Sequence, residues 1–501
     1  MNQSSQNSSP NQHVVKATIL SRVLGTVVPE DMARLSSDTV YYGLGKTAEA
    51  LAALILIPVL TRALSPAEFG LWDVVMTFFL LTTTVGSLSI EPAVATLYYE
   101  TQRPEERKLV VSTGILFRLL SSIVLTVPLF VFSPQISEMI FGGPEHFKSI
   151  CIVAAAMPFF LLMNLQKQLF RIDFAPGKFN LLSIGFAGMY AALSIVLVVK
   201  TPLGVNGVLT GLLASAICVS VIGWALTLSR FSLEFSGRVL RRMLVVGLPL
   251  IPFFLSTWVI DSSSRYFLTR LSTLEQVGIY SVGVKISSIV GMFVMSFQMA
   301  WAPVALSIQH ETDAKERYSR GVLFFFVVSL TVGTAITVFG RQLLMLLAHP
   351  KYYGAEDVIG MLVLAMIAFG AFLVLSAGLL IAKRTVYASV AIVAGAAVNL
   401  LLNLLLIPDF GIVGAAVATL CAYSLTLLLI YRFVQKFYPV DYAVRRIAGL
   451  VALSVATMVV SRLLGFETSP VTDLLVKALI MAGFLVCVWR VFLPGTARAV
   501  A

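Results

Sequence analysis

EDVIGMLVLAMIAFGAFLVLSAGLLI, residues 356–381, begins with two acidic residues and then carries no charge as far as Ile381. A helix of about 20 apolar residues is long enough to cross the roughly 30 Å hydrocarbon core of a bilayer. This stretch therefore predicts a transmembrane helix. Segments of similar character recur along most of the chain.

The composition agrees with a protein that lies mostly within a membrane. Of 501 residues, 58% are hydrophobic and 12% are charged, whereas soluble domains carry about 25% charged residues. This excludes an ordinary soluble enzyme as well as a disordered or fibrous chain. The net charge of +11 indicates basic cytoplasmic loops, not nucleic-acid binding. The four cysteines and four histidines are scattered, so neither a disulfide framework nor a metal site is expected.

Fourteen apolar segments are predicted to span the membrane. They are residues 40–62, 71–97, 110–133, 149–169, 180–199, 206–229, 243–263, 277–308, 321–340, 356–381, 387–407, 412–431, 444–462 and 472–492. With the N-terminus inside, about two thirds of the 36 Lys and Arg residues fall on inner loops and termini, as the positive-inside rule requires. This predicts that both termini are cytoplasmic. Residues 14–28 have the pattern of an amphipathic helix, lying on the inner surface or packed on the protein.

An internal repeat relates the two halves of the chain. LTRALSPAEFGLW (60–72) and LTRLSTLEQVGIY (268–280) share Leu-Thr-Arg followed eight residues later by Gly, at an offset of 208. GVNG (204–207) and GIVG (411–414) repeat at an offset of 207. The offset covers six helices, and an even number keeps both copies in the same orientation about an axis along the membrane normal.

The expected fold class is therefore an all-α polytopic membrane protein, with about 14 transmembrane helices in two six-helix lobes plus two C-terminal helices. The expected domains are a cytoplasmic tail with the amphipathic helix (1–37), an N-lobe (38–229), a cytoplasmic linker (230–242), a C-lobe (243–434), and helices 13–14 with the C-terminal tail (435–501). Substrate sites in such transporters lie between the halves.

Charged residues inside spans are the candidate site residues, because each costs about 2.5–3.5 kcal/mol unless it meets water or a partner. Arg118, Arg265 and Lys285 are expected to line a hydrated cleft that accepts an anion. Asp261 lies four residues before Arg265 and can pair with it. The alternative is an interfacial salt bridge near the outer headgroups.

Lys46 and Glu49 share one face of the first span. Lys46 is a further candidate cavity cation, and Glu49 is the expected protonatable coupling group. The alternative is that Lys46 extends to the interface with Glu49 as its partner.

Other polar and helix-breaking residues in the spans are expected to be structural. Pro249, Pro252 and Pro303 lie in apolar helices that they should kink or break. Asn399 and Asn403, four residues apart, are expected to form hydrogen bonds between helices.

Several stretches resemble one family of transporters. LTRALSPAEFGLW matches its first-turn pattern, and VGLPLIPFFLSTWVIDSSSRYFLTRLSTLEQVGIYSVGVKISS (246–288) matches its seventh and eighth helices. FQMAWAPVALS (297–307), GLLIAKRTVY (378–387) and NLLLNLLLIPDFGIVGAAVATL (399–420) continue the match. The chain resembles the oligosaccharide flippases for O-antigen and exopolysaccharide, the polysaccharide-transporter branch of the multidrug/oligosaccharidyl-lipid/polysaccharide exporter superfamily.

The resemblance implies a function and a location. Such flippases move polyprenyl-pyrophosphate-linked oligosaccharide from the inner to the outer leaflet of the bacterial inner membrane. The implied partners are this lipid-linked glycan, membrane lipids, and polysaccharide polymerase or export machinery. No cofactor or enzymatic activity is expected. Cations in a hydrated cleft suit the pyrophosphate because they offer charge-assisted hydrogen bonds.

Three other functions remain open at this point. A peptidoglycan-precursor flippase also resembles a fourteen-span bundle. A drug or cation antiporter of the same superfamily would need an acidic cavity. A glycan polymerase or ligase would need a catalytic constellation on a sizeable outer loop, and the predicted outer loops are short.

Overall fold

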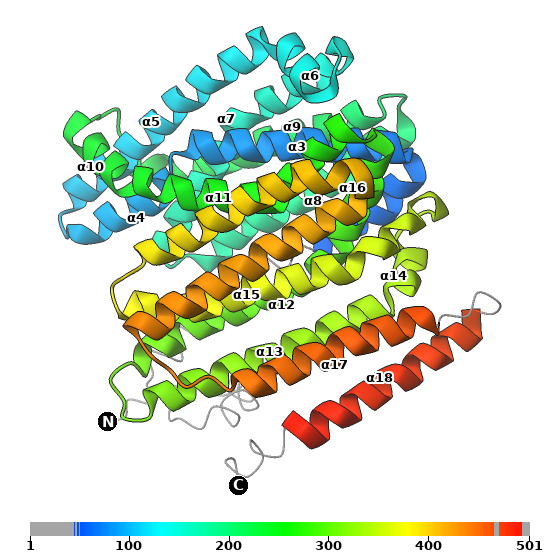
Figure 1. Cartoon of the computed structure of the whole chain (residues 1–501). Helices are drawn as coiled ribbons and strands as arrows, with labels where there is room; N and C mark the ends of the chain where they lie inside the picture. Colours follow the sequence, from blue (N-terminus) through cyan, green and yellow to red (C-terminus); the bar gives the residue numbers. More distant parts are fainter. Residues whose placement is uncertain (1–44, 46–47, 50, 465–469, 493–501) are drawn as a thin grey trace, which may run out of the picture.

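Long helices run roughly parallel to one another through the molecule (Figure 1). The computed structural model describes residues 45, 48–49, 51–464 and 470–492, and within these ranges all regular structure is helical. The helices are α3 (Pro66–Ser87), α4 (Ile90–Glu100), α5 (Pro104–Val131), α6 (Ser133–Phe141), η1 (Pro144–His146), α7 (Phe147–Ile172), α8 (Pro176–Lys200), α9 (Val205–Thr227), η2 (Leu228–Arg230), α10 (Gly237–Gly247), η3 (Leu248–Leu250), α11 (Ile251–Leu271), α12 (Leu274–Ser307), α13 (Ala314–Val338), α14 (Gly340–Leu347), η4 (Pro350–Ala355), α15 (Glu356–Ile381), α16 (Val386–Phe437), α17 (Val444–Leu463) and α18 (Pro470–Phe492).

The number of apolar segments agrees with the prediction once α16 is understood as two helices. In the described ranges, 12 helices are long and apolar enough to cross a membrane, and a shorter apolar helix spans Leu51–Ala63. The helix α16 has 52 residues but is interrupted by the non-helical backbone of Gly411. It folds back there, because a Cβ on Gly395 would touch Thr426. The two arms are the predicted spans 387–407 and 412–431, and the polytopic all-α fold is confirmed. The predicted tail 1–37 lies outside the described residues.

The same glycine turn occurs at the repeated position in the other half. Gly204, which precedes α9, and Gly411 both have φ 51° and ψ −127°. A positive φ is readily adopted by glycine and costly for other residues. The GVNG and GIVG echo of the sequence therefore encodes one tight turn, used once between α8 and α9 and once inside α16.

The first repeat motif brings α3 and α12 into backbone contact. A Cβ on Gly70 would lie 2.1 Å from the carbonyl oxygen of Leu274, and a Cβ on Gly278 would lie 2.0 Å from that of Pro66. Both distances are impossible for a real side chain, so each glycine allows the opposite backbone to approach. The two contacts are equivalent, because Gly70 corresponds to Gly278 in the repeat and Pro66 corresponds to Leu274. We call this contact the glycine crossing.

The helix starts next to the crossing are also repeated. Ser65 caps α3 by accepting a hydrogen bond from the backbone N–H of Glu68, and Thr273 caps α12 by accepting one from Gln276. Hydroxyl side chains at this position satisfy backbone donors that the helix leaves free. The two halves therefore share local structure as well as sequence.

Two membrane-spanning segments are broken, and their breaks touch. The α3–α4 segment breaks at Leu88 and Ser89, whose φ values are 45° and 52°. The α10–α11 segment breaks through η3, which contains Pro249 and leads to Pro252 at the start of α11. Gly247 sits against the break in the first segment, because a Cβ there would lie 2.6 Å from the carbonyl oxygen of Leu88. By contrast, α12 continues as a helix through Pro303 to Ser307.

The last two long helices lie along one edge of the bundle (Figure 1). Both α17 and α18 pack against α13. Within α18, Lys477 and Asp473 form a buried ion pair at 3.0 Å, and Gln342 of α14 attaches the helix by donating a hydrogen bond of 2.6 Å to Asp473.

Candidate functional site

A buried carboxylate from one half meets two cations from the other half one helical turn beyond the glycine crossing. Arg265 of α11 donates through Nε to Asp73 of α3, and Lys285 of α12 lies 3.0 Å from the same carboxylate. Ser281 of α12 donates a third hydrogen bond of 2.7 Å. We call these four residues the Asp73 cluster. It joins three helices from opposite halves of the repeat.

Burial makes this arrangement energetically significant. Asp73 is 4% exposed and Arg265 is 8% exposed. Removing one partner of a buried ion pair lowers the free energy of unfolding by about 3–5 kcal/mol, because the other charge is left buried without a partner. Lys285 is less enclosed, and its ammonium lies 4.6 Å from the ring centre of Trp72, close enough for a cation–π interaction. Two cations share one carboxylate, so the Asp73 cluster carries a net positive charge.

Asp261 contacts Arg265 in a different way from the predicted side-chain pair. Its backbone carbonyl accepts a 2.7 Å hydrogen bond from Arg265. Its carboxylate instead accepts a hydrogen bond from the hydroxyl of Tyr423 in α16. The salt-bridge partner of Arg265 is Asp73, on another helix and in the other half. A helical i, i+4 spacing permits a pair but does not exclude a better partner across an interface.

The structure places Arg118 apart from Arg265 and Lys285. Arg118 in α5 is fully buried, pairs with Glu91 at 2.6 Å, and donates a 3.1 Å hydrogen bond to the carbonyl of Gly86. Gly86 lies thirteen residues after Asp73 in α3, which is about 20 Å along a helix axis. The arginine therefore supports the end of α3, next to the break at Leu88 and Ser89.

Glu49 has a partner that the sequence did not indicate. Lys167 of α7 lies 2.5 Å from its carboxylate, and the lysine side chain is buried. The ammonium also lies 5.5 Å from the ring centre of Phe179. Lys46 lies outside the described residues.

Asn399 and Asn403 join α16 to α11. Ser263 donates to Asn399 and Ser264 donates to Asn403, both at 3.0 Å, and the two asparagines bond to each other at 2.9 Å. All four side chains are buried. The arrangement fixes the surface of α11 that carries Asp261 and Arg265.

Comparison with known proteins identifies the family. A family model described as polysaccharide biosynthesis protein matches residues 35–309, more than half of the chain. The chain belongs to this family. The family resemblance inferred from the sequence is thereby confirmed. A second family model, MatE, matches residues 249–405.

A curated relative of this chain is an uncharacterized membrane protein from Methanocaldococcus jannaschii. It is 27% identical over 212 residues, which are 40% of this chain and 41% of the relative. The chain thus matches about two fifths of the length of that protein.

Solved structures show that the fold is shared more widely. Lipid II flippase MurJ in an inward closed conformation has a TM-score of 0.73 at 13% identity, covering 90% of this chain and 99% of that one. An inward-facing multidrug resistance MATE transporter has a TM-score of 0.63 at 15% identity, covering 81% and 96%. A transporter from Pyrococcus furiosus has a TM-score of 0.58 at 13% identity, covering 83% and 96%. These structures show that the fold of this chain is one found in membrane transporters.

Sequence reasoning missed three charged residues of these pairs: Asp73, Glu91 and Lys167. Each lies inside a predicted span, Asp73 within GLWDVVMTFF (70–79). The sequence could have indicated them, because an acidic side chain inside a span costs about as much insertion free energy as a basic one. Within the described ranges, no three His, Cys, Asp or Glu side chains gather as metal ligands.

Proposed function

We propose that this family member is a flippase that moves polyprenyl-pyrophosphate-linked oligosaccharide from the inner to the outer leaflet by alternating access. The family match supports polysaccharide biosynthesis. The fold, shared with a lipid II flippase, suits a long lipid-linked substrate. The prenyl tail stays in lipid while the headgroup passes between the halves.

The observation that carries this proposal is the Asp73 cluster. Arg265 and Lys285 bind a carboxylate that belongs to the opposite half, so the halves cannot separate there without leaving two cations unpaired. A pyrophosphate offers more negative charge and more acceptor oxygens than one carboxylate. It therefore competes with Asp73 for the same cations, and binding of substrate favours separation of α3 from α11 and α12.

The proposed moving parts are the predicted lobes, 38–229 and 243–434, joined by the linker 230–242, with helices 13–14 in 435–501. In the predicted orientation, both termini face the cytoplasm and the glycine crossing closes the outer side. This orientation can be tested on a chain without its four native cysteines. External thiol labelling should reach Glu138→Cys and Thr273→Cys but not Arg238→Cys or Lys315→Cys. Labelling of Arg238→Cys from outside would overturn it.

Glu49 remains the proposed coupling group. Protonation of its carboxylate weakens the bond to Lys167, and this pair lies in the N-lobe, away from the Asp73 cluster. Lys46 remains a proposed cavity cation on the same helix face, and Asp261 is proposed to position Arg265 through its carbonyl. Polysaccharide polymerase or export machinery is the proposed protein partner.

Complementation of a bacterial strain that lacks its polysaccharide flippase tests the proposal. Wild type should restore glycan export, whereas Arg265→Ala and Lys285→Ala should abolish it at normal protein level. Lys477→Ala is the matched control, because Lys477 is also a buried lysine in an ion pair but lies in α18. Export by both Arg265→Ala and Lys285→Ala would rule out the cationic site.

A lipid II flippase is the second candidate function, favoured by the TM-score of 0.73 to MurJ. The same charge argument holds, since that substrate also carries a pyrophosphate. Rescue of a strain depleted of its lipid II flippase, with no rescue of glycan export, would select this alternative. Efflux of a cationic drug would instead select an antiporter.

A further inference from the structure

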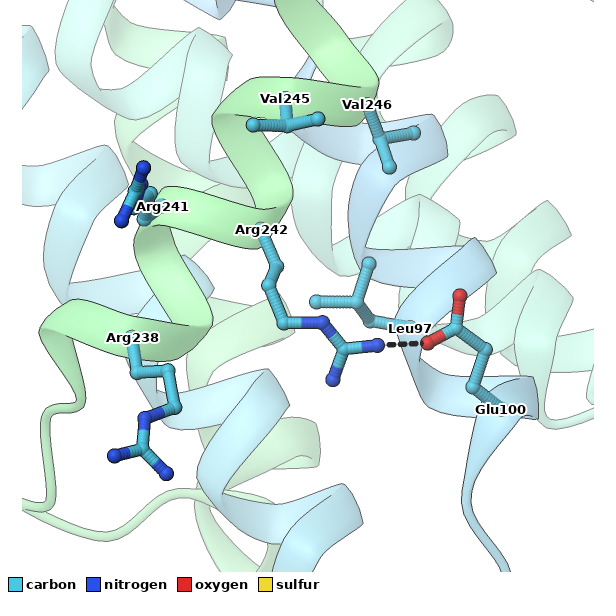
Figure 2. Close-up of a pocket in the computed structure, with 7 residues that line it drawn as sticks. All are labelled: Leu97, Glu100, Arg238, Arg241, Arg242, Val245 and Val246. Atoms are coloured by element: carbon cyan, nitrogen blue, oxygen red, sulfur yellow. Dashed lines mark hydrogen bonds and ion pairs between the residues drawn. The ribbon is translucent and has the colours of Figure 1, made fainter.

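The helix α10 connects the two halves and carries a basic face. Arg238, Arg241 and Arg242 are spaced i, i+3 and i+4, so they share one side of the helix, and all three are exposed. The other side holds α10 to the protein through Met243, which is buried against α4 and α5. On the arginine face, Arg242 reaches toward α4, whereas Arg241 points away from it (Figure 2).

This face borders a cavity of about 420 Å³. Two residues at the end of α4, Leu97 and Glu100, form one wall. The other wall is formed by α10, through the three arginines and the valines 245 and 246. Figure 2 shows Arg242 reaching across this space to Glu100.

The cavity has unbalanced positive charge. Arg242 forms an ion pair with Glu100, which neutralises one of the three arginines. In the described part of the chain, Arg238 and Arg241 form no ion pair. Three arginines and one glutamate leave a net charge of +2 at pH 7.

The position of α10 along its segment places the cavity at headgroup depth. The helix α11 alone has 21 residues, about 32 Å, which is enough to cross the hydrocarbon core. The helix α3 has 22 residues and is equally sufficient. Because α10 precedes α11 and α4 follows α3, the far ends of both short helices, which carry Arg238 and Glu100, extend beyond the core on the same side, and the two helices pack against each other.

The cavity changes from charged to apolar along α10. Arg238 lies at its start, and Val245, which is 67% exposed, lies two turns later toward the membrane. Leu248, just after α10, is also exposed. A soluble anion would leave these apolar side chains in water. An amphiphile covers them while its phosphate meets the arginines, as basic amphipathic helices do at bilayer surfaces.

We infer that this cavity binds the headgroup phosphate of an anionic bilayer phospholipid, with the acyl chains lying along Val245, Val246 and Leu97. The phosphate bonds to Arg238 and Arg241, while Arg242 is held by Glu100. The lipid thereby attaches the linker between the two halves to the inner leaflet. This site is separate from the Asp73 cluster, and its binding of phospholipid does not depend on which substrate the protein carries.

Native mass spectrometry of the purified full-length protein, titrated with phosphatidylglycerol or phosphatidylcholine, tests the inference. The Arg238→Gln/Arg241→Gln double variant should bind phosphatidylglycerol about 25-fold more weakly, since each of the two basic residues near a membrane surface is worth about fivefold. The matched control is Arg445→Gln/Arg446→Gln, which removes the same charge from two exposed arginines at the start of α17. It should change the affinity less than twofold.

A single substitution should increase the affinity of the site for anionic lipid. Glu100→Gln releases Arg242 and raises the net charge of the cavity, so it should bind phosphatidylglycerol severalfold more tightly with no change for phosphatidylcholine. This variant decides the question if the double variant fails to fold.

Equal losses in the two double variants would show general attraction to charge and overturn the inference. No gain from Glu100→Gln would also overturn it. Displacement of phosphatidylglycerol by polyprenyl pyrophosphate, but not by excess phosphatidylserine, would assign the cavity to the substrate instead.

Discussion

The charged side chains inside the two halves differ in where their ion-pair partners lie. In the first half, Arg118 pairs with Glu91 and Lys167 pairs with Glu49, so each bond stays within that half. In the second half, the salt bridges of Arg265 and Lys285 both go to Asp73 in the first half. A bond within one half persists when the halves move as units, whereas a bond between them must break. The first kind supports structure, and the second kind is suited to report and control the relative position of the halves.

Removal of Arg118 should have the largest effect on stability. Arg118→Ala leaves Glu91 and the carbonyl of Gly86 without their buried donor, which should cost about 3–5 kcal/mol of unfolding free energy. Thermal unfolding in detergent measures this. Arg462→Ala breaks an exposed pair with Asp357 and serves as the control, with an expected cost under about 1 kcal/mol. If Arg118→Ala were stable but inactive in export, the division into structural and mobile pairs would fail.

Asp73→Asn should shift the equilibrium between conformations. It removes the charge that holds Arg265 and Lys285 across the interface, and hydrogen bonds to charged groups are worth about 1.5–3 kcal/mol each. In a cysteine-free background, Val277→Cys is buried next to the crossing and should be labelled about tenfold faster when Asp73→Asn is added. Val363→Cys, buried inside the second half, should show no change. Equal labelling of Val277→Cys in both backgrounds would remove the gating role of Asp73.

Gly278→Ala tests the crossing without altering charge. The added Cβ would lie 2.0 Å from the carbonyl oxygen of Pro66, so α3 and α12 must separate at a cost of about 1–3 kcal/mol. Val277→Cys labelling should again rise. Gly188→Ala is the control, because nothing lies within 4 Å of its Cβ position. A neutral Gly278→Ala would show that the close approach is unimportant for this conformation.

Arg265→Lys should have the smallest effect of the series. Lysine keeps the charge but cannot bond both Asp73 and the Asp261 carbonyl as the guanidinium does. Loss of one hydrogen bond is worth about 1 kcal/mol, or about fivefold in export rate. Export equal to wild type would mean that charge alone matters at this position.

The sequence was informative where structure depends on local pattern. The apolar runs located the helices because hydropathy acts over about 20 neighbouring residues. The repeat of Gly70 and Gly278 indicated two related halves, but it did not predict that these glycines meet. The partners of Arg118 and Glu49 could not be predicted in this way, because they lie on other helices and the spacing of residues along one helix gives no information about contacts between helices. Asp73 differs from these partners, because a single acid inside an apolar run can be recognised from the sequence alone by the high free-energy cost of placing it in the membrane.

The Asp73 cluster also shows that the interface between the two halves is chemically asymmetric. Asp73 and Ser281 occupy the same repeat position and touch each other at 2.7 Å. Two aspartates so close in a buried site could not both ionise, and two serines would leave Arg265 without its carboxylate partner. One acid and one hydroxyl at this position therefore give the contact a single negative charge, which an exactly repeated pair of residues would not provide.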